Sequence, residues 1–167
     1  LHQYSQELYL DALTGAFNRR YYEEQFCGQD SADGVAVLDV DNFKAINDTY
    51  GHQAGDAALR TIVQAIVGCI RNSDILIRYG GDEFLLVFPD IPEPVFRRRL
   101  QEISSAVSDA TVPDHPEMRL SVSVGGVYKM SPLSDAVYHA DTLMYKAKTE
   151  KRQMMLHNHE HDRLMPD

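Results

Sequence analysis

Residues 75–88 read ILIRYGGDEFLLVF, two apolar runs that meet at a Gly-Gly pair. Glycine adopts positive φ angles without steric penalty, so this pattern predicts a β-hairpin with strands over 75–79 and 83–88. Two adjacent carboxylates, Asp82 and Glu83, follow the turn directly. Acidic residues are common near turns, and taken alone these two indicate a structural role.

A second acidic cluster argues against a purely structural role. Residues 35–40 (VAVLDV) form an apolar run that predicts a buried central strand, with Asp39 inside its end and Asp41 just beyond. An acid at the end of a core strand is desolvated and repelled by other carboxylates unless a cation neutralises it. Brought together, residues 39, 41, 82 and 83 would supply the hard oxygen ligands that Mg²⁺ or Mn²⁺ prefer.

Polar residues are dense after this strand. Lys44 could hold a phosphate as a point charge, and it stands where an EF-hand loop would need glycine. Asn47 suits a turn, and Asp56 suits the N-cap of the helix that follows; for Asp56 alone the cap is the favoured interpretation. The alternative is base recognition, because a carboxylate accepts two N–H donors from guanine and an amide can meet its O6/N7 edge. No P-loop or G-x-G-x-x-G motif is present.

The rest of the chain alternates between helical and extended patterns. Apolar residues at 59, 62, 63, 66, 67 and 70 predict an amphipathic helix. Other segments with a clear period are the expected helices over residues 18–27, 96–107 and 133–147 and an expected half-buried strand over residues 119–127. Residues 1–13 have near-helical spacing, and the polar stretch from His157 is expected to be frayed. The pattern predicts an α+β (α/β-like) sheet with helices packed on it.

Composition bounds the possible functions. The 167 residues suffice for one domain, and 44% hydrophobic with 25% charged residues is typical of a globular protein. The net charge of −9 disfavours nucleic acid and anionic membrane surfaces as partners. Two cysteines without metal-ligand spacing fit a reducing, cytoplasmic compartment, and no apolar run reaches the roughly 20 residues that span a bilayer. The start has neither Met nor a basic segment, so we expect a fragment of a longer protein without a signal peptide.

With these residues in view, RYGGDEF at 78–84 resembles the signature of the GGDEF family, the bacterial diguanylate cyclases. The resemblance extends to DALTGAFNRR at 11–20 and to DVDNFKAINDTYGHQAGD at 39–56. It also includes the strand at 120–126 and the helix ADTLMYKAK at 140–148. These motifs follow the order that the family has, and together they span about residues 11–152.

The resemblance implies a fold and a reaction. The fold would be the nucleotidyl-cyclase palm, a central, mostly antiparallel sheet flanked by helices, with the GGDEF turn on a β-hairpin. The reaction would condense two GTP into cyclic di-GMP with release of two pyrophosphates, using Mg²⁺ or Mn²⁺, two ions per site. Each protomer would hold one GTP, so catalysis would need a homodimer. The alternative is a catalytically silent module that senses GTP or cyclic di-GMP, which the intact turn disfavours.

The resemblance also implies a division of the chain. Residues 1–10 would end a linker helix from an upstream sensory domain. Residues 11–155 would form the catalytic domain, and residues 156–167 a polar tail. The full-length protein could be membrane-anchored through segments that precede Leu1.

Site residues are carried over by position. Asp39, Asp82 and Glu83 would bind metal with the carbonyl of Val40, and either Asp82 or Glu83 would assist deprotonation of the ribose 3′-OH. The phosphates would contact the backbone N–H of Phe43 and the side chains of Lys44, Lys148 and Arg152. The base and ribose would contact Asn47, His52 and Asp56, while the turn itself comprises Gly80, Gly81 and the supporting Arg78. Near Arg152 the family commonly has G-R-N, whereas this chain has Glu150-Lys151-Arg152-Gln153.

Arg71-Asn72-Ser73-Asp74 is an R-x-x-D run shortly before the hairpin turn. Alone, it is typical of an arginine at a helix end followed by an aspartate in a turn. Its placement resembles the family's inhibitory product site, which implies that Arg71 and Asp74 bind cyclic di-GMP. One arginine of residues 97–99 could complete that site from a neighbouring subunit.

Overall fold

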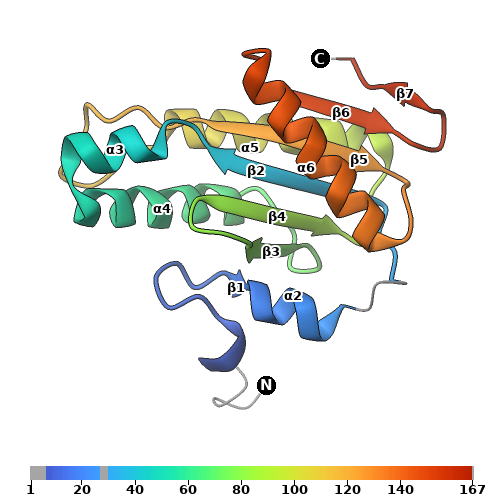
Figure 1. The fold of residues 1–167 in the computed structure, drawn as a ribbon, viewed down its shortest axis with the longest axis horizontal. Coiled ribbons are helices and arrows are strands. Elements are labelled where there is room, and N and C mark those ends of the chain that lie inside the picture. The colour runs from blue at the N-terminus through green and yellow to red at the C-terminus, as the bar shows by residue number, and fades with distance from the viewer. Residues whose placement is uncertain (1–6, 27–29, 167) are drawn as a thin grey trace.

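A computed structural model describes residues 7–26 and 30–166. The core is a mixed sheet of seven strands in the order β1-β3-β4-β2-β5-β6-β7 (Figure 1). The strands are β1 (Phe17–Asn18), β2 (Gly34–Val40), β3 (Ile75–Arg78), β4 (Glu83–Phe88), β5 (Val122–Tyr128), β6 (Met154–Asn158) and β7 (Arg163–Leu164). The central strands pair antiparallel, while β1 pairs parallel with β3 and β6 pairs parallel with β5. The expected hairpin of β3 and β4 is confirmed.

Helices cover both faces of the sheet (Figure 1). They are α2 (Arg19–Gln25), α3 (Phe43–Tyr50), α4 (His52–Val67), α5 (Glu93–Asp109) and α6 (Leu133–Thr149). Apolar residues of α4 and α5 pack on one face, and those of α6, with aromatic residues of β1 and α2, pack on the other. Among the described residues, no helix combines the length and apolarity needed to cross a bilayer.

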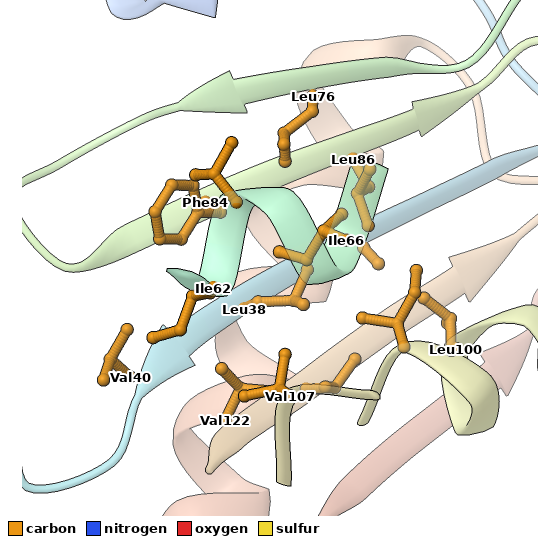
Figure 2. Close-up of a cluster of buried hydrophobic side chains, with 14 of the residues drawn as sticks. Leu38, Val40, Ile62, Ile66, Leu76, Phe84, Leu86, Leu100, Val107 and Val122 are labelled. Atoms are coloured by element: carbon orange, nitrogen blue, oxygen red, sulfur yellow. The ribbon is translucent and has the colours of Figure 1, made fainter. Parts of the chain in front are cut away.

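The central strand β2 is buried on both faces, which explains its continuous apolar run. Leu38 and Val40 join Ile62 and Ile66 of α4 in the larger core cluster, drawn in Figure 2. Val35 and Val37 face α6 instead. Side chains alternate along a strand, so the next odd-numbered residue, Asp39, projects to the α6 face.

Gly125 of β5 lets α6 lie directly against the sheet. A Cβ atom at this position would come within 2.1 Å of the Ala140 carbonyl oxygen and 2.2 Å of the Met144 nitrogen. Both of these atoms belong to the backbone of α6. Only glycine therefore permits this close approach of helix and strand.

The ends of the chain differ from expectation. The stretch from His157 is not frayed within the described residues, because β6 pairs with β5, β7 pairs with β6, and Asn158 is buried. The apolar run Met154–Leu156 anchors β6, which continues the sheet past residue 155.

The expected N-terminal helix ends early. Of residues 1–13, residues 1–6 lie outside the described part, and residues 7–9 are helical. A turn then begins at Asp11, because its carboxylate accepts hydrogen bonds from the Thr14 N–H and hydroxyl and Gly15 adopts φ 79°. These contacts replace helical hydrogen bonding, and the chain turns back to form β1.

Candidate active site

The two acidic clusters converge at one end of the sheet. Asp39 is in register with Glu83 of β4 on one side and with Ser123 of β5 on the other. Residues in register on neighbouring strands share a face, so Asp39 and Glu83 both project to the side covered by α6. The Val40 N–H donates to the Asp82 carbonyl at 3.0 Å, which ties the hairpin turn to the end of β2.

The carboxylates destabilise one another's charged forms. Burial raises the pKa of Asp39; a hydrogen bond from Lys148 opposes this rise and the charge of Asp82 adds to it. Burial also raises the pKa of Glu83, and the charges of Asp141 and Asp39 add to that shift. The site thus holds partly buried carboxylates close together, with Lys148 as the cation bonded to Asp39.

One carboxylate oxygen of Asp39 is unsatisfied within the described part of the chain. Its Oδ2 atom accepts a hydrogen bond from Lys148 Nζ at 2.8 Å, whereas its Oδ1 atom is buried and has no hydrogen-bond partner among the described residues. A divalent cation would satisfy such an oxygen. No three His, Cys, Asp or Glu side chains of the described residues are grouped to hold one ion. Mg²⁺ typically binds one or two carboxylates and completes its shell with waters and substrate phosphates, and Asp39 and Glu83 are two such carboxylates in register.

Arg78 holds the hairpin turn. Its Nε and Nη2 atoms donate to the Gly81 carbonyl at 3.1 and 2.7 Å, and its Nη1 atom lies 3.2 Å from the Asp11 carboxylate. Burial alone would raise the pKa of Asp11, but hydrogen bonds from Thr14 and the charge of Arg78 outweigh it and lower the pKa. Asp11 was not among the expected site residues; only its place in the DALTGAFNRR motif could have indicated it.

Asp41 does not join Asp39 as an expected metal ligand. Ser121 Oγ and Ser123 Oγ each donate to one of its carboxylate oxygens, both at 2.6 Å. The carboxylate therefore ties the end of β2 to β5. The next residue, Asn42, takes left-handed backbone (φ 57°) and starts α3.

The start of α3 presents groups that suit phosphate. The first N–H groups of a helix lack intrahelical acceptors and attract anions, and α3 begins at Phe43. Lys44 follows with its side chain 89% exposed and an ion pair to Asp48 at 2.9 Å. An ion pair this exposed is weak, so Lys44 can turn to another anion.

The expected base-binding residues lie at the junction of α3 and α4. Asn47 is inside α3 rather than in a turn, and a Cβ atom on Gly55 would come within 1.9 Å of Asn47 Oδ1. The interpretation of Asp56 as an N-cap is wrong, because α4 begins at His52 after Gly51 and Asp56 lies a turn inside. Gly51 has φ 93°, which bends the chain there and begins the helix early. His52 and Asp56 are both exposed.

A pocket of about 480 Å³ opens beside the carboxylates, between β5 and the end of α6. Lys148, Lys151 and Arg152 line it, together with the Asp41 carboxylate and the two serines that donate to Asp41. Three basic side chains outnumber this one carboxylate, and the excess of positive charge suits phosphate oxygens.

Arg71 and Asp74 form a separate cluster that is already satisfied. The Arg71 N–H and Nη2 atoms donate to the two Asp74 carboxylate oxygens, each at 2.8 Å, and Nη2 also donates to the Asp90 carbonyl at 2.7 Å. Arg99 Nη1 lies 3.7 Å from Asp74 Oδ2. Arg99 therefore reaches Asp74 from α5 of the same chain.

Residues 8–154 match the family described as "Diguanylate cyclase, GGDEF domain". The chain belongs to the GGDEF family. This GGDEF domain is 31% identical over 156 residues to the probable diguanylate cyclase DgcC of Escherichia coli (strain K12). The alignment covers 85% of the domain and 41% of DgcC, so the chain spans less than half of this relative's length.

Solved structures resemble the GGDEF domain over nearly its whole length. The coiled coil and GGDEF domain of DgcB from Caulobacter crescentus, in complex with c-di-GMP, gives a TM-score of 0.82 at 26% identity, covering 93% of this chain and 88% of that one. The diguanylate cyclase SiaD from Pseudomonas aeruginosa, in complex with its activator SiaC, gives 0.78 at 30% identity, covering 93% and 63%. The expected nucleotidyl-cyclase palm fold is confirmed.

Proposed function

We propose that this GGDEF domain condenses two GTP into cyclic di-GMP and releases two pyrophosphates. The observation that carries the proposal is Asp39, whose buried Oδ1 atom lacks a partner within the part of the chain that the structure describes, while Glu83 and the GGDEF turn lie beside it. Two anionic groups at the end of a core strand are unfavourable without a cation. Nucleotidyl transfer requires a site that binds metal and phosphate together.

The reaction joins each nucleotide to the other. The 3′ oxygen of one GTP attacks the α-phosphorus of the second, a P–O bond forms, and pyrophosphate leaves. Asp39, Asp82 and Glu83 with the Val40 carbonyl would hold Mg²⁺ or Mn²⁺, as two ions. The bound metal supplies a lowered pKa of the attacking hydroxyl and neutralisation of phosphate charge. Asp82 or Glu83 accepts the hydroxyl proton.

The substrate extends from this site in two directions. The phosphates bind the Phe43 N–H, Lys44, Lys148 and Arg152, the last two at the pocket beside β5. The guanine and ribose bind Asn47, His52 and Asp56 near the junction of α3 and α4. Without metal and GTP, Lys148 forms an ion pair with Asp39 and neutralises its carboxylate. When metal and phosphate bind, Lys148 leaves this carboxylate and contacts the phosphate.

Two copies of the domain are needed for a complete reaction. Each chain supplies one cluster of these carboxylates within its described residues, and each GTP must act as both nucleophile and acceptor. A homodimer with facing sites meets this requirement. A sensory domain upstream, as the greater length of the relatives suggests, would control how the copies meet. The substrate GTP and the cysteine pattern favour the cytoplasm.

Incubation with GTP and Mg²⁺ tests the proposal. We expect cyclic di-GMP to form with release of two pyrophosphates for each molecule of product. We expect no product from ATP. GTP binding without either product would instead show the silent sensor module, and the proposal would be wrong.

Arg71 and Asp74 would bind the product and inhibit the enzyme. The partly exposed Arg71 side chain supports this role, because it lines a second pocket of about 280 Å³ with Asn72 and Asp74. Arg71→Ala should relieve inhibition by cyclic di-GMP and leave the initial rate nearly unchanged. Calorimetric titration of cyclic di-GMP into both proteins measures this directly. Equal affinities would reduce the R-x-x-D run to a structural turn.

A further inference from the structure

Lys151 ends α6 in an unfavourable backbone conformation. Its φ of 56° lies in the left-handed region. The Lys151 N–H donates to the Lys148 carbonyl at 3.2 Å, and the Arg152 N–H donates to the Ala147 carbonyl at 2.8 Å. These two bonds form a Schellman motif, in which the left-handed position is usually glycine because a Cβ atom crowds the following carbonyl. The helix ending alone would be better served by glycine.

The side chain of Lys151 lies at the phosphate-like pocket. It lines the same 480 Å³ space as Lys148 and Arg152, and the Asp41 carboxylate in this pocket is held by Ser121 and Ser123. Lys148 is already paired with a carboxylate, Asp39 Oδ2. No carboxylate among residues 7–26 and 30–166 forms an ion pair with Lys151, whose side chain is exposed to solvent. Its charge is therefore available to a ligand of this pocket.

We propose that Lys151 is an additional substrate-binding residue that contacts the terminal phosphate of GTP. The inference rests on the proposed function, since it takes the triphosphate as the ligand of this pocket. A triphosphate carries several negative charges, and Lys148 is partly neutralised by its ion pair with Asp39. A further cation in the pocket therefore strengthens triphosphate binding. Binding of phosphate by the ammonium would offset the cost of the left-handed backbone at this position.

A structural account competes with this one. A positive charge near the C-terminus of a helix interacts favourably with the helix dipole, so Lys151 could act only on the stability of α6. The two accounts differ in what happens when both the charge and the strain are removed. Lys151→Gly does this in one step.

The test measures binding and stability separately. The ligands are 3′-deoxy-GTP, which lacks the attacking hydroxyl and cannot react, and 3′-deoxy-GDP, which also lacks the terminal phosphate. With Mg²⁺ present, Lys151→Gly should weaken 3′-deoxy-GTP binding roughly three- to tenfold, as expected for loss of one charge-assisted contact. Binding of 3′-deoxy-GDP should change by less than about twofold. The melting temperature should rise by about 2–4 °C as strain is relieved.

Two further variants sharpen the result. Lys151→Asn removes the charge but keeps a residue that tolerates the left-handed region, and it should weaken 3′-deoxy-GTP binding to the same degree. Lys146→Gln removes an exposed charge of α6 that does not line the pocket, and it should leave both affinities unchanged.

Three outcomes would contradict an assignment. Unchanged 3′-deoxy-GTP affinity in Lys151→Gly would overturn the proposal, leaving Lys151 as a helix end. Equal weakening for both ligands would also overturn it, because the charge would not act at the terminal phosphate. If Lys148→Ala binds 3′-deoxy-GTP as the wild type does, the pocket is not the triphosphate site and the Lys151 assignment fails, whereas absence of cyclic di-GMP from GTP and Mg²⁺ would overturn the proposed function.

Discussion

Asp39 and Asp74 are aspartates with largely buried side chains beside strands of one sheet, but their surroundings differ. Asp74 is fully enclosed, and its two oxygens together accept hydrogen bonds from Arg71, with Arg99 close by. Within residues 7–26 and 30–166, Asp39 has one cationic partner, a buried oxygen with no hydrogen-bond partner, and other carboxylates nearby. The Asp74 cluster is complete as it stands, whereas the Asp39 cluster becomes favourable only with an added cation. Of these two buried acids, only Asp39, which its own fold leaves unsatisfied, therefore indicates a cation site.

The largest expected effect is on turnover at the unsatisfied cluster. Asp39→Asn should reduce cyclic di-GMP synthesis by about a hundredfold or more, because the metal loses an anionic ligand. Its melting temperature without metal should be equal to or above that of the wild type, since the repulsion disappears. Pyrophosphate release and thermal unfolding with and without Mg²⁺ measure both. Asp109→Asn, an exposed acid at the end of α5, is the control. Activity near that of the wild type in Asp39→Asn would contradict the metal assignment.

Asp56 extends the comparison to an exposed carboxylate. Asp56→Ser should relax the preference for GTP over ATP by about tenfold, because adenine lacks the two N–H donors that the carboxylate would accept. Exposure places this effect at the lower end of the usual range for a lost polar contact. The ratio of kcat/KM for GTP and ATP measures it. Since Asp56 is not an N-cap, stability should hardly change. An unaltered ratio would place base selection at other residues.

Substitution in the Asp74 cluster should change the free energy of unfolding. Asp74→Asn leaves Arg71 and Arg99 without their carboxylate, and we expect a loss of about 1–3 kcal/mol in the free energy of unfolding. Urea unfolding of Asp74→Asn beside Asp39→Asn measures the contrast. If Asp39→Asn proved the more destabilised of the two without metal, the distinction between the clusters would be wrong.

The smallest expected effect comes from substitution of Asp11, and this effect on stability should depend on pH. Hydrogen bonds to Thr14 and Arg78 bring its pKa below the ordinary value of 3.8, so the folded state favours the charged form. The stabilisation is present above pH 3.8 and is lost as the pH falls through the lower pKa of the folded state. Asp11→Asn should therefore cost about 1 kcal/mol at neutral pH. Unfolding curves of both proteins should approach each other in acid; a constant difference down to pH 2, roughly, would contradict this linkage.

Local patterns in the sequence were sufficient for much of the sheet and its helices. The Gly-Gly turn predicted the hairpin of β3 and β4, and apolar periodicity predicted α4, α5 and α6. β6 was missed because Met154–Leu156 is short, and its parallel pairing with β5 depends on the intervening α6. Gly51 also masked the start of α4, since the apolar stripe begins only after the first turn of the helix.

The sequence predicted which residues belong to the site, but it did not predict most of the contacts between them. The motifs identified Asp39 and the GGDEF turn, and the structure brings them into register. The serines that hold Asp41 and the link between Asp11 and Arg78 were not predictable, because each joins residues far apart in the sequence. Whether a carboxylate is satisfied is a property of such long-range contacts, so the sequence alone cannot separate Asp39 from Asp41.

Gly125 influences the geometry of the active site from a distance, through the position of α6. Its missing side chain sets the spacing between the sheet and α6, and Lys148 lies four residues beyond Met144 on that helix, hydrogen-bonded to Asp39. A methyl group at position 125 would overlap the backbone of α6, so the helix would have to move away from the sheet. The hydrogen bond from Lys148 to Asp39 joins this helix to this sheet, and its geometry therefore depends on the glycine at position 125.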